Sequence, residues 1–241
     1  VQNHFERQYA TFQLLTDALR PALEATSLRW ILDPEGVLIS NALLRIDGAR
    51  KEHVPVTHRP LVADPRIVRY VQGFAGLDEK LGGVARLEAG LDLDRHPLTL
   101  TPKDDATLRA IVRQAADPTT RNELPLFFLR GPDGVGKHTW SRTIAGALGL
   151  KHLRVDLVAL VAEYGHLEHG LRIALREARL QGAMLCLDGW ARLVEPARMD
   201  EVPSRRDQGP RLEASRIILR VLGTPPFTIT TDDTLVEPPT L

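Results

Sequence analysis

The sequence predicts an α/β fold: a parallel sheet with flanking helices, preceded by a small winged-helix-like domain. From Leu124 onward, short apolar segments alternate with segments of helical periodicity, which is typical of a parallel sheet. A glycine-rich loop joins the first of these strands to a helix, and a later apolar strand ends in an aspartate. We therefore expect an N-terminal domain over residues 1–101, a linker helix over 102–124 and an α/β core over 125–241.

The N-terminal domain has the weaker pattern. Its first apolar residues recur at roughly helical spacing, and helices followed by a short hairpin suggest a winged-helix-like module. The turn between the strands is Asp33-Pro34-Glu35-Gly36. We expect a helical segment over 4–30, interrupted by Pro21, strands at 28–32 and 37–46, and helices near 64–74 and 77–88.

The α/β core has a more regular pattern. A stretch at 94–103 looks like a linker before the first helix, and the charged, proline-bearing stretch at 195–210 looks like an exposed loop. The expected strands are 126–130, 152–157, 183–188 and 226–231, and the expected helices are 104–116, 137–148, 167–180 and 211–222.

Composition narrows the functional classes. The 241 residues carry 31 basic and 31 acidic side chains, so the basic excess of many nucleic-acid-binding proteins is missing and a nucleic-acid partner is not expected. Cys186 is the single cysteine, which excludes an intrachain disulfide and favours a reducing, cytoplasmic location. We find no signal peptide and no apolar run long enough to span a membrane. A first residue Val1 suggests a processed or partial chain.

The loop after the first core strand matches the P-loop pattern G-x4-G-K. Its glycines let the backbone approach phosphate groups, and its N–H groups point inward at the positive end of a helix dipole. Lys137 would neutralise the β- and γ-phosphates, so it is both a binding and a catalytic candidate. The alternative is a glycine-rich turn that binds no ligand. The candidate ATP-binding residues are Gly131, Pro132, Asp133, Gly134, Val135, Gly136, Lys137, His138 and Thr139.

A second candidate is Asp188, which ends the apolar strand 183–188. P-loop ATPases use such a carboxylate to hold Mg²⁺, so Asp188 is a catalytic and metal-ligand candidate. The alternative is that Asp188 only caps the next helix. The usual Mg²⁺-binding hydroxyl after the lysine is replaced by His138, and a neutral imidazole is a poor Mg²⁺ ligand. Either water fills that position, or Thr139 approaches by a shift of register, or metal binding is weak.

Residues 103–232, with these two motifs in this order, resemble the AAA+ ATPase family. The string from Asp156 through Leu193 looks like its second strand, pore-loop region, second helix and Walker B segment. The resemblance implies self-assembly into a ring and a protein partner that is remodelled or loaded. Tyr164-Gly165 falls near the family's aromatic pore loop, although a tyrosine that merely packs at a helix start is an equal alternative.

The chain departs from the family at several points. Gly189 stands where the family has a glutamate that polarises the attacking water, and Glu195 is too far along to be assumed a substitute. Asp232 would be an acidic variant of the family's sensor asparagine. The family's fifth strand, arginine finger and helical lid would follow Leu241. Segments 42–48 and 60–84 resemble winged-helix AAA+ ATPases encoded with bacterial contractile injection systems.

The function expected from these patterns is an AAA+ module that binds ATP and Mg²⁺ and hydrolyses ATP, although Gly189 and His138 leave the enzymatic activity uncertain. One alternative is an assembly protein that binds ATP with little turnover. Another is a winged-helix DNA-binding regulator, against which the neutral charge argues. A metal on His166 and His169 is not expected, and Cys186 is expected to be inert packing. The loop arginines Arg205, Arg206 and Arg211 are expected at the solvated surface.

Overall fold

We describe a computed structural model, which defines residues 10–19, 33, 36–47, 55–92, 101–116, 127–194, 208–222 and 227–231. Contacts divide the chain into two compact units, Val1–Gly76 and Leu77–Leu241. Each unit is described by itself. None of the described helices is both long and apolar enough to cross a membrane.

The first unit contains a three-stranded antiparallel sheet with the order β1-β3-β2. Asp64 caps helix α4 by accepting a hydrogen bond from the Arg66 N–H at 2.9 Å, and Pro65 opens the helix. The elements are β1 (Ala10–Thr11), α1 (Phe12–Leu19), α3 (Val37–Ser40), β2 (Leu44–Ile46), η1 (Val56–His58), β3 (Pro60–Ala63) and α4 (Pro65–Val71).

Some expectations for this unit need correction. The strand expected over 37–46 is wrong in its first half, because Val37–Ser40 forms the short helix α3 and only Leu44–Ile46 is a strand. The Gly36 N–H donates to the Asp33 carbonyl at 2.7 Å, as the expected turn requires. The expected helix near 64–74 is α4, whereas the strand expected at 28–32 lies outside the described residues. The winged-helix-like architecture stays a prediction.

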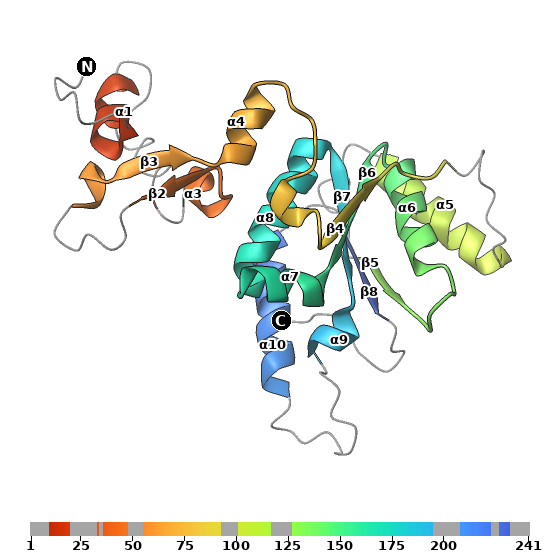
Figure 1. Cartoon of the computed structure of the whole chain (residues 1–241). Helices are drawn as coiled ribbons and strands as arrows, with labels where there is room; N and C mark the ends of the chain where they lie inside the picture. The colour runs from red at the N-terminus through yellow and green to blue at the C-terminus, as the bar shows by residue number, and fades with distance from the viewer. Residues whose placement is uncertain are drawn as a thin grey trace. The chain divides into compact units, whose positions relative to one another are not determined.

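The second unit is built on a five-stranded sheet with the order β4-β6-β7-β8-β5 (Figure 1). The last four of these run parallel, as the sequence predicts, whereas β4 runs antiparallel to β6. Parallel strands bring their carboxyl ends to one edge, where ligands bind in open α/β sheets. The strands are β4 (Ala85–Glu88), β5 (Phe127–Arg130), β6 (Lys151–Asp156), β7 (Ala183–Asp188) and β8 (Phe227–Thr231).

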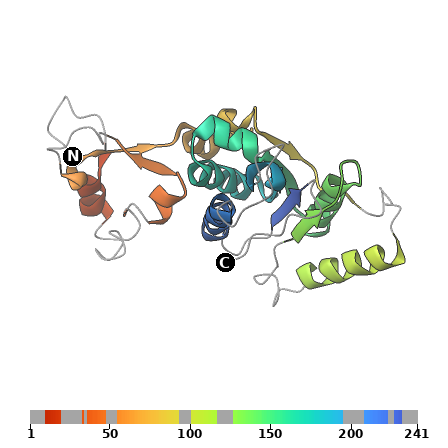
Figure 2. The same cartoon turned by 90° about the horizontal axis from the view of Figure 1, so that it is seen from below.

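Helices cover both faces of this sheet (Figures 1 and 2). Helices α5 and α6 lie on one side, and α7, α8 and α10 lie on the other. The four expected helices of the core are confirmed, and the short helices α7 and α9 are additional. Their bounds are α5 (Pro102–Ala116), α6 (Lys137–Ala147), α7 (Leu157–Tyr164), α8 (Leu167–Gln181), α9 (Trp190–Val194) and α10 (Gln208–Leu222).

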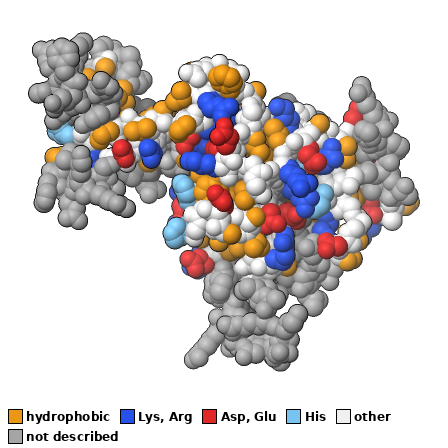
Figure 3. Space-filling model, viewed as in Figure 1, with side chains coloured by type: hydrophobic (Ala, Val, Ile, Leu, Met, Phe, Trp, Pro, Cys, Tyr) orange, Lys and Arg blue, Asp and Glu red, His pale blue; other side chains and the backbone are white. Residues whose placement is uncertain are grey.

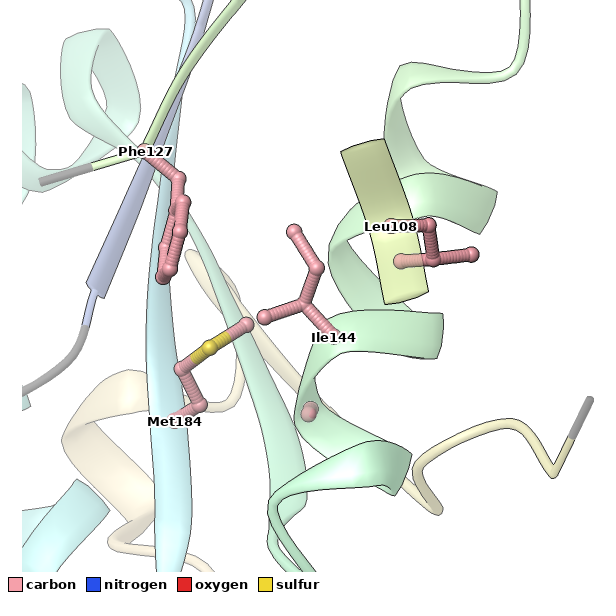
Figure 4. Packing of buried hydrophobic residues seen from close by; sticks show 5 residues of the cluster. Leu108, Phe127, Ile144 and Met184 are labelled. Carbon is pink, nitrogen blue, oxygen red and sulfur yellow. The ribbon is translucent and has the colours of Figure 1, made fainter. Parts of the chain in front are cut away.

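A hydrophobic cluster joins α5 and α6 to the sheet. Phe127 of β5 and Met184 of β7 extend from the strands toward Ile144 of α6 (Figure 4). Leu108 of α5 is fully buried in the same cluster. Helix α5, expected to be part of a linker, therefore contributes to the core of the second unit.

Residues 77–92 also belong to the second unit rather than to the N-terminal domain in which they were expected. The helix expected near 77–88 is wrong, since this stretch forms the 3-10 helix η2 (Glu79–Leu81) and strand β4. In β4 the residues Ala-Arg-Leu-Glu alternate between apolar and charged, which suits a strand. A buried ion pair of 2.5 Å between Asp78 and Arg176 ties η2 to α8.

The segment after β4 lies directly against α6. A Cβ on Gly90 would lie 2.5 Å from the Gly146 Cα, and a Cβ on Gly146 would lie 2.1 Å from the Leu91 carbonyl oxygen. The Leu91 N–H donates to the Arg142 carbonyl at 2.9 Å. The two glycines thus allow a backbone crossing that no side chain could fit.

Candidate nucleotide-binding site

The predicted P-loop lies between β5 and α6. Gly131, Gly134 and Gly136 have φ angles of 154°, 83° and 89°, which residues with a side chain rarely adopt. A Cβ on Gly134 or Gly136 would meet nothing within 4 Å, so the loop has open space beside it. Helix α6 begins at Lys137 directly after the loop and supplies the positive end of an eleven-residue helix. The loop therefore has the backbone form of an anion cradle.

Lys137 folds back over this loop. Its side chain is 6% exposed, and its Nζ donates to the carbonyl oxygens of Gly131 at 2.7 Å and Pro132 at 2.9 Å. The Asp133 carboxylate lies 3.9 Å from the same Nζ. The ammonium group is therefore held at the mouth of the loop, where a phosphate would meet it.

Asp188 ends β7 beside the loop, as the sequence predicts, and is paired with an arginine. Arg154 of β6 donates from Nε at 3.0 Å and from a terminal nitrogen at 2.5 Å, both to Asp188 Oδ2. His138 Nε2 lies 3.6 Å from the same oxygen. The carboxylate is largely buried, with its side chain 7% exposed. The three predicted residues Lys137, His138 and Asp188 thus lie together.

A second arginine–carboxylate pair lies alongside the first. Asp156 ends β6 directly opposite Asp188 in the register of the two strands. One Asp156 oxygen caps α7 by accepting from two backbone N–H groups, and the other accepts from Arg192 at 3.0 Å. A Cβ on Gly189, whose φ is 82°, would lie 2.6 Å from the Arg192 guanidinium. Arg192 therefore occupies the space beside the backbone of Gly189.

His152 of β6 lies behind the site and is fully buried. Its Nε2 is hydrogen-bonded to the Ser141 hydroxyl at 2.8 Å, and Glu88 lies 3.8 Å from its Nδ1. Burial lowers the pKa of His152 from 6.5 to about 4, with smaller contributions from Arg142, His138 and Arg154. The imidazole is therefore neutral at physiological pH and adds no charge to the site.

The donor set does not fit Mg²⁺ well. Mg²⁺ requires oxygen ligands in octahedral geometry, and Oδ2 of the carboxylate expected to hold it already accepts from the Arg154 guanidinium. An imidazole nitrogen follows Lys137 where a hydroxyl is needed. None of the described hydrogen bonds joins the half-buried Thr139 hydroxyl to Asp188. Thr139 as a metal ligand stays a prediction that the local geometry does not favour.

The remaining candidates lie apart from the loop or outside the described residues. Tyr164 ends α7 rather than starting a helix, and its half-buried ring packs edge-on against His169 with centroids 5.6 Å apart. Cys186 is fully buried in β7, as expected of inert packing. The structure does not describe Glu195, Arg205, Arg206 or Asp232, nor the side chain of Arg211.

Sequence reasoning missed the two arginines. The signal for Arg154 lies in the strand H-L-R-V-D-L, where His152, Arg154 and Asp156 alternate with apolar residues. Side chains two apart in a strand share a face, so this alternation predicts one polar face that ends in a carboxylate. Arg192 gave no comparable signal, since its contact depends on the turn that follows β7.

Comparisons with known proteins found similarity only at the level of structure. No protein-family model matches the chain, and no curated protein matches it. The chain is similar to the FIGL-1 AAA domain, with a TM-score of 0.43, 15% identity, and coverage of 78% of this chain and 57% of that one. The same domain in complex with ADP gives a TM-score of 0.46 and 15% identity, with coverage of 70% and 56%.

A katanin structure that concerns self-assembly gives a TM-score of 0.41 and 18% identity, with coverage of 70% of this chain and 54% of that one. The chain therefore spans little more than half the length of these solved structures.

Proposed function

We propose that the chain is a nucleotide-binding module of the AAA+ type that takes ATP in the loop Gly131–Thr139. The observation that carries this proposal is the cradle itself. Three glycines with positive φ, the start of α6 and the inward-turned ammonium of Lys137 come together in one loop, and a Cβ on Gly134 or Gly136 would meet nothing within 4 Å. Backbone N–H groups and a helix N-terminus favour a phosphate there, and Lys137 would exchange its two carbonyl contacts for phosphate oxygens.

Binding of a fluorescent ATP analogue to the 241-residue chain tests the proposal. Lys137→Ala removes the ammonium and is expected to weaken binding about a hundredfold, since a charge-assisted contact in a partly buried site is worth roughly 1.5–3 kcal/mol. Lys151→Ala is the matched control, because this exposed lysine starts β6 at the opposite edge of the sheet. Equal affinity of Lys137→Ala and the unaltered chain would contradict the proposal.

A second candidate function is ATP binding with very slow hydrolysis, as in a protein that uses the nucleotide to fix an assembly. The observation that favours it is the surroundings of Gly189. This residue has no carboxylate to orient water, and the Arg192 guanidinium lies against it. Positioning groups in phosphoryl transfer are worth on the order of 10³ or more in rate. We therefore expect turnover far below roughly 1 s⁻¹.

Gly189→Glu is the direct test of this second candidate, and it needs a companion change. A glutamate alone would meet the Arg192 side chain at a strained φ, so Gly189→Glu should be combined with Arg192→Ala. Phosphate release that rises in the double variant but not in Arg192→Ala alone would show that only the orienting carboxylate is missing. Brisk hydrolysis by the unaltered chain, lost in Lys137→Ala, would instead favour an active ATPase.

Self-assembly into a ring and action on a protein partner follow from the AAA+ resemblance, and we include them in the proposal. Light scattering with and without ATP measures the molar mass of the assembly and so tests ring formation. A crosslinking group introduced at Tyr164 would test whether a protein partner binds there. In the structure the Tyr164 ring packs on His169.

A further inference from the structure

The pairing of Asp188 with Arg154 has a consequence for the form of nucleotide that the loop binds. An arginine that donates twice to a carboxylate in a partly buried site makes a strong charge-assisted contact, and here both donors meet the same oxygen, Asp188 Oδ2. Here the Asp188 side chain is 7% exposed and that of Arg154 37% exposed, with contacts of 2.5 and 3.0 Å. A metal ion on Oδ2 would have to displace the guanidinium and then remain beside it, which costs the pair and adds like-charge repulsion.

Among the described residues, the carboxylate nearest to Asp188 in the strand register is already engaged. Asp156, directly opposite Asp188 in the strand register, already accepts from Arg192 and from two backbone N–H groups of α7. Among the described residues, the cations Lys137, Arg154 and Arg192 lie beside the carboxylates Asp133, Asp188 and Asp156 respectively, so these formal charges balance before any ligand arrives. Figure 3 likewise shows basic side chains interspersed with acidic ones on the face of the molecule seen there.

The arginine also retains donors for an anion. A guanidinium carries five N–H donors, and among the residues that the structure describes, the contacts of Arg154 are those that Nε and one terminal nitrogen make with Asp188. The other terminal nitrogen is available for a phosphate oxygen. Asp188 would then act as a positioning residue that holds the arginine, rather than as a metal ligand.

We propose that Arg154, held by Asp188, takes the place of Mg²⁺, so that this chain binds the nucleoside triphosphate as the metal-free anion. The inference rests on the proposed ATP-binding function. It also accounts for His138, because a site without a metal needs no hydroxyl after the lysine.

The test is the affinity of the full chain for a fluorescent ATP analogue in excess EDTA and in excess Mg²⁺. We expect the two dissociation constants to agree within about twofold. Arg154→Gln should weaken metal-free binding about tenfold or more, and Arg154→Lys should retain part of it, because it keeps the charge but loses the planar fork. Circular dichroism checks that each variant folds.

The matched control is Arg172→Gln, which breaks a similarly half-buried pair with Glu168 at 2.7 Å on the opposite face of the sheet. It should leave both affinities unchanged. Binding that requires Mg²⁺ would overturn the inference while leaving the ATP-binding proposal intact. Metal-independent binding that Arg154→Gln does not weaken would overturn the role of Arg154. No binding under either condition would overturn both proposals.

Discussion

At the scale of single residues, the candidate site is defined by the ion pairs that its charged side chains form. The motif places Lys137 and Asp188 correctly at the carboxyl edge of the sheet, because a strand before the loop and a helix after it are local features. The partner of Asp188 could not be read from the motif, since it comes from 34 residues earlier in the chain. This partner, Arg154, determines whether Oδ2 of Asp188 is available to a metal ion.

His152 gives a residue-scale prediction for stability against pH. Its pKa is lowered from 6.5 to about 4 in the folded chain, so below pH 6.5 the unfolded chain takes up a proton that the folded chain resists. The folded chain therefore keeps its full free energy of unfolding above pH 6.5, and it loses the contribution of the neutral His152 as the pH falls toward 4. We expect the free energy of unfolding to fall by about 3 kcal/mol across this window from His152 alone.

Urea denaturation at a series of pH values measures this contribution. His152→Gln keeps a group that can bond to Ser141 but does not titrate, so the difference between the two curves isolates the histidine. His58→Gln, at an exposed position in η1, is the control for the exchange of a histidine for a glutamine. A pH profile that His152→Gln fails to flatten would contradict the buried, neutral imidazole.

At the scale of elements, the strands and helices of the α/β core follow the sequence closely, because each carries its own periodicity and length. The misassigned elements are short. The four-residue strand β4 and the four-residue helix α3 contain too few residues to show a period, and tertiary contacts determine their form. Helix α5 was recognised as a helix, but its role in the core depends on the buried Leu108 and not on local sequence.

The crossing of the segment after β4 over α6 gives an element-scale prediction. Helix propensity alone says that Gly146→Ala in α6 should stabilise the chain by about 0.5–1 kcal/mol. The Cβ would instead lie 2.1 Å from the Leu91 carbonyl oxygen, so the backbones must separate. We expect a destabilisation of about 3 kcal/mol, the upper end of ordinary overpacking costs.

Thermal and urea unfolding of Gly146→Ala check the sign of the effect. Gly83→Ala, where a Cβ would meet nothing within 4 Å, is the control and should change stability by less than about 0.5 kcal/mol. A stabilised Gly146→Ala variant would show that residues 89–92 do not lie against α6.

At the scale of the whole molecule, the boundary between the two units is the main difference from the sequence-based division. Composition favoured a boundary after residue 101, where a linker-like stretch ends, whereas the contacts place it between Gly76 and Leu77. Residues 77–92 contribute β4, the Gly90 crossing and the Asp78 partner of Arg176 to the second unit. These contacts join residues far apart in sequence, which local patterns do not report.

Two truncations discriminate between the boundaries. A chain that begins at Leu77 should unfold cooperatively and bind ATP within about threefold of the full chain. A chain that begins at Pro102 loses β4 and leaves the buried Arg176 without Asp78, a change that typically costs about 3–5 kcal/mol. Equal stability of the two fragments, measured by urea unfolding, would support the boundary at residue 101 instead.

The short strand β4 has a further consequence, for the behaviour of the protein at high concentration. Unpaired backbone at the edge of a sheet is a template for pairing with another chain, and the six-residue strand β6 would be such a template without its antiparallel neighbour. With β4 in place, the outer strands of the sheet, as far as it is described, are β4 and β5, each only four residues long. Arg86 and Glu88 of β4 add charge at one margin. Short edge strands with charged side chains pair less readily with the sheet of another molecule. We therefore expect β4 to reduce edge-to-edge aggregation in addition to completing the sheet.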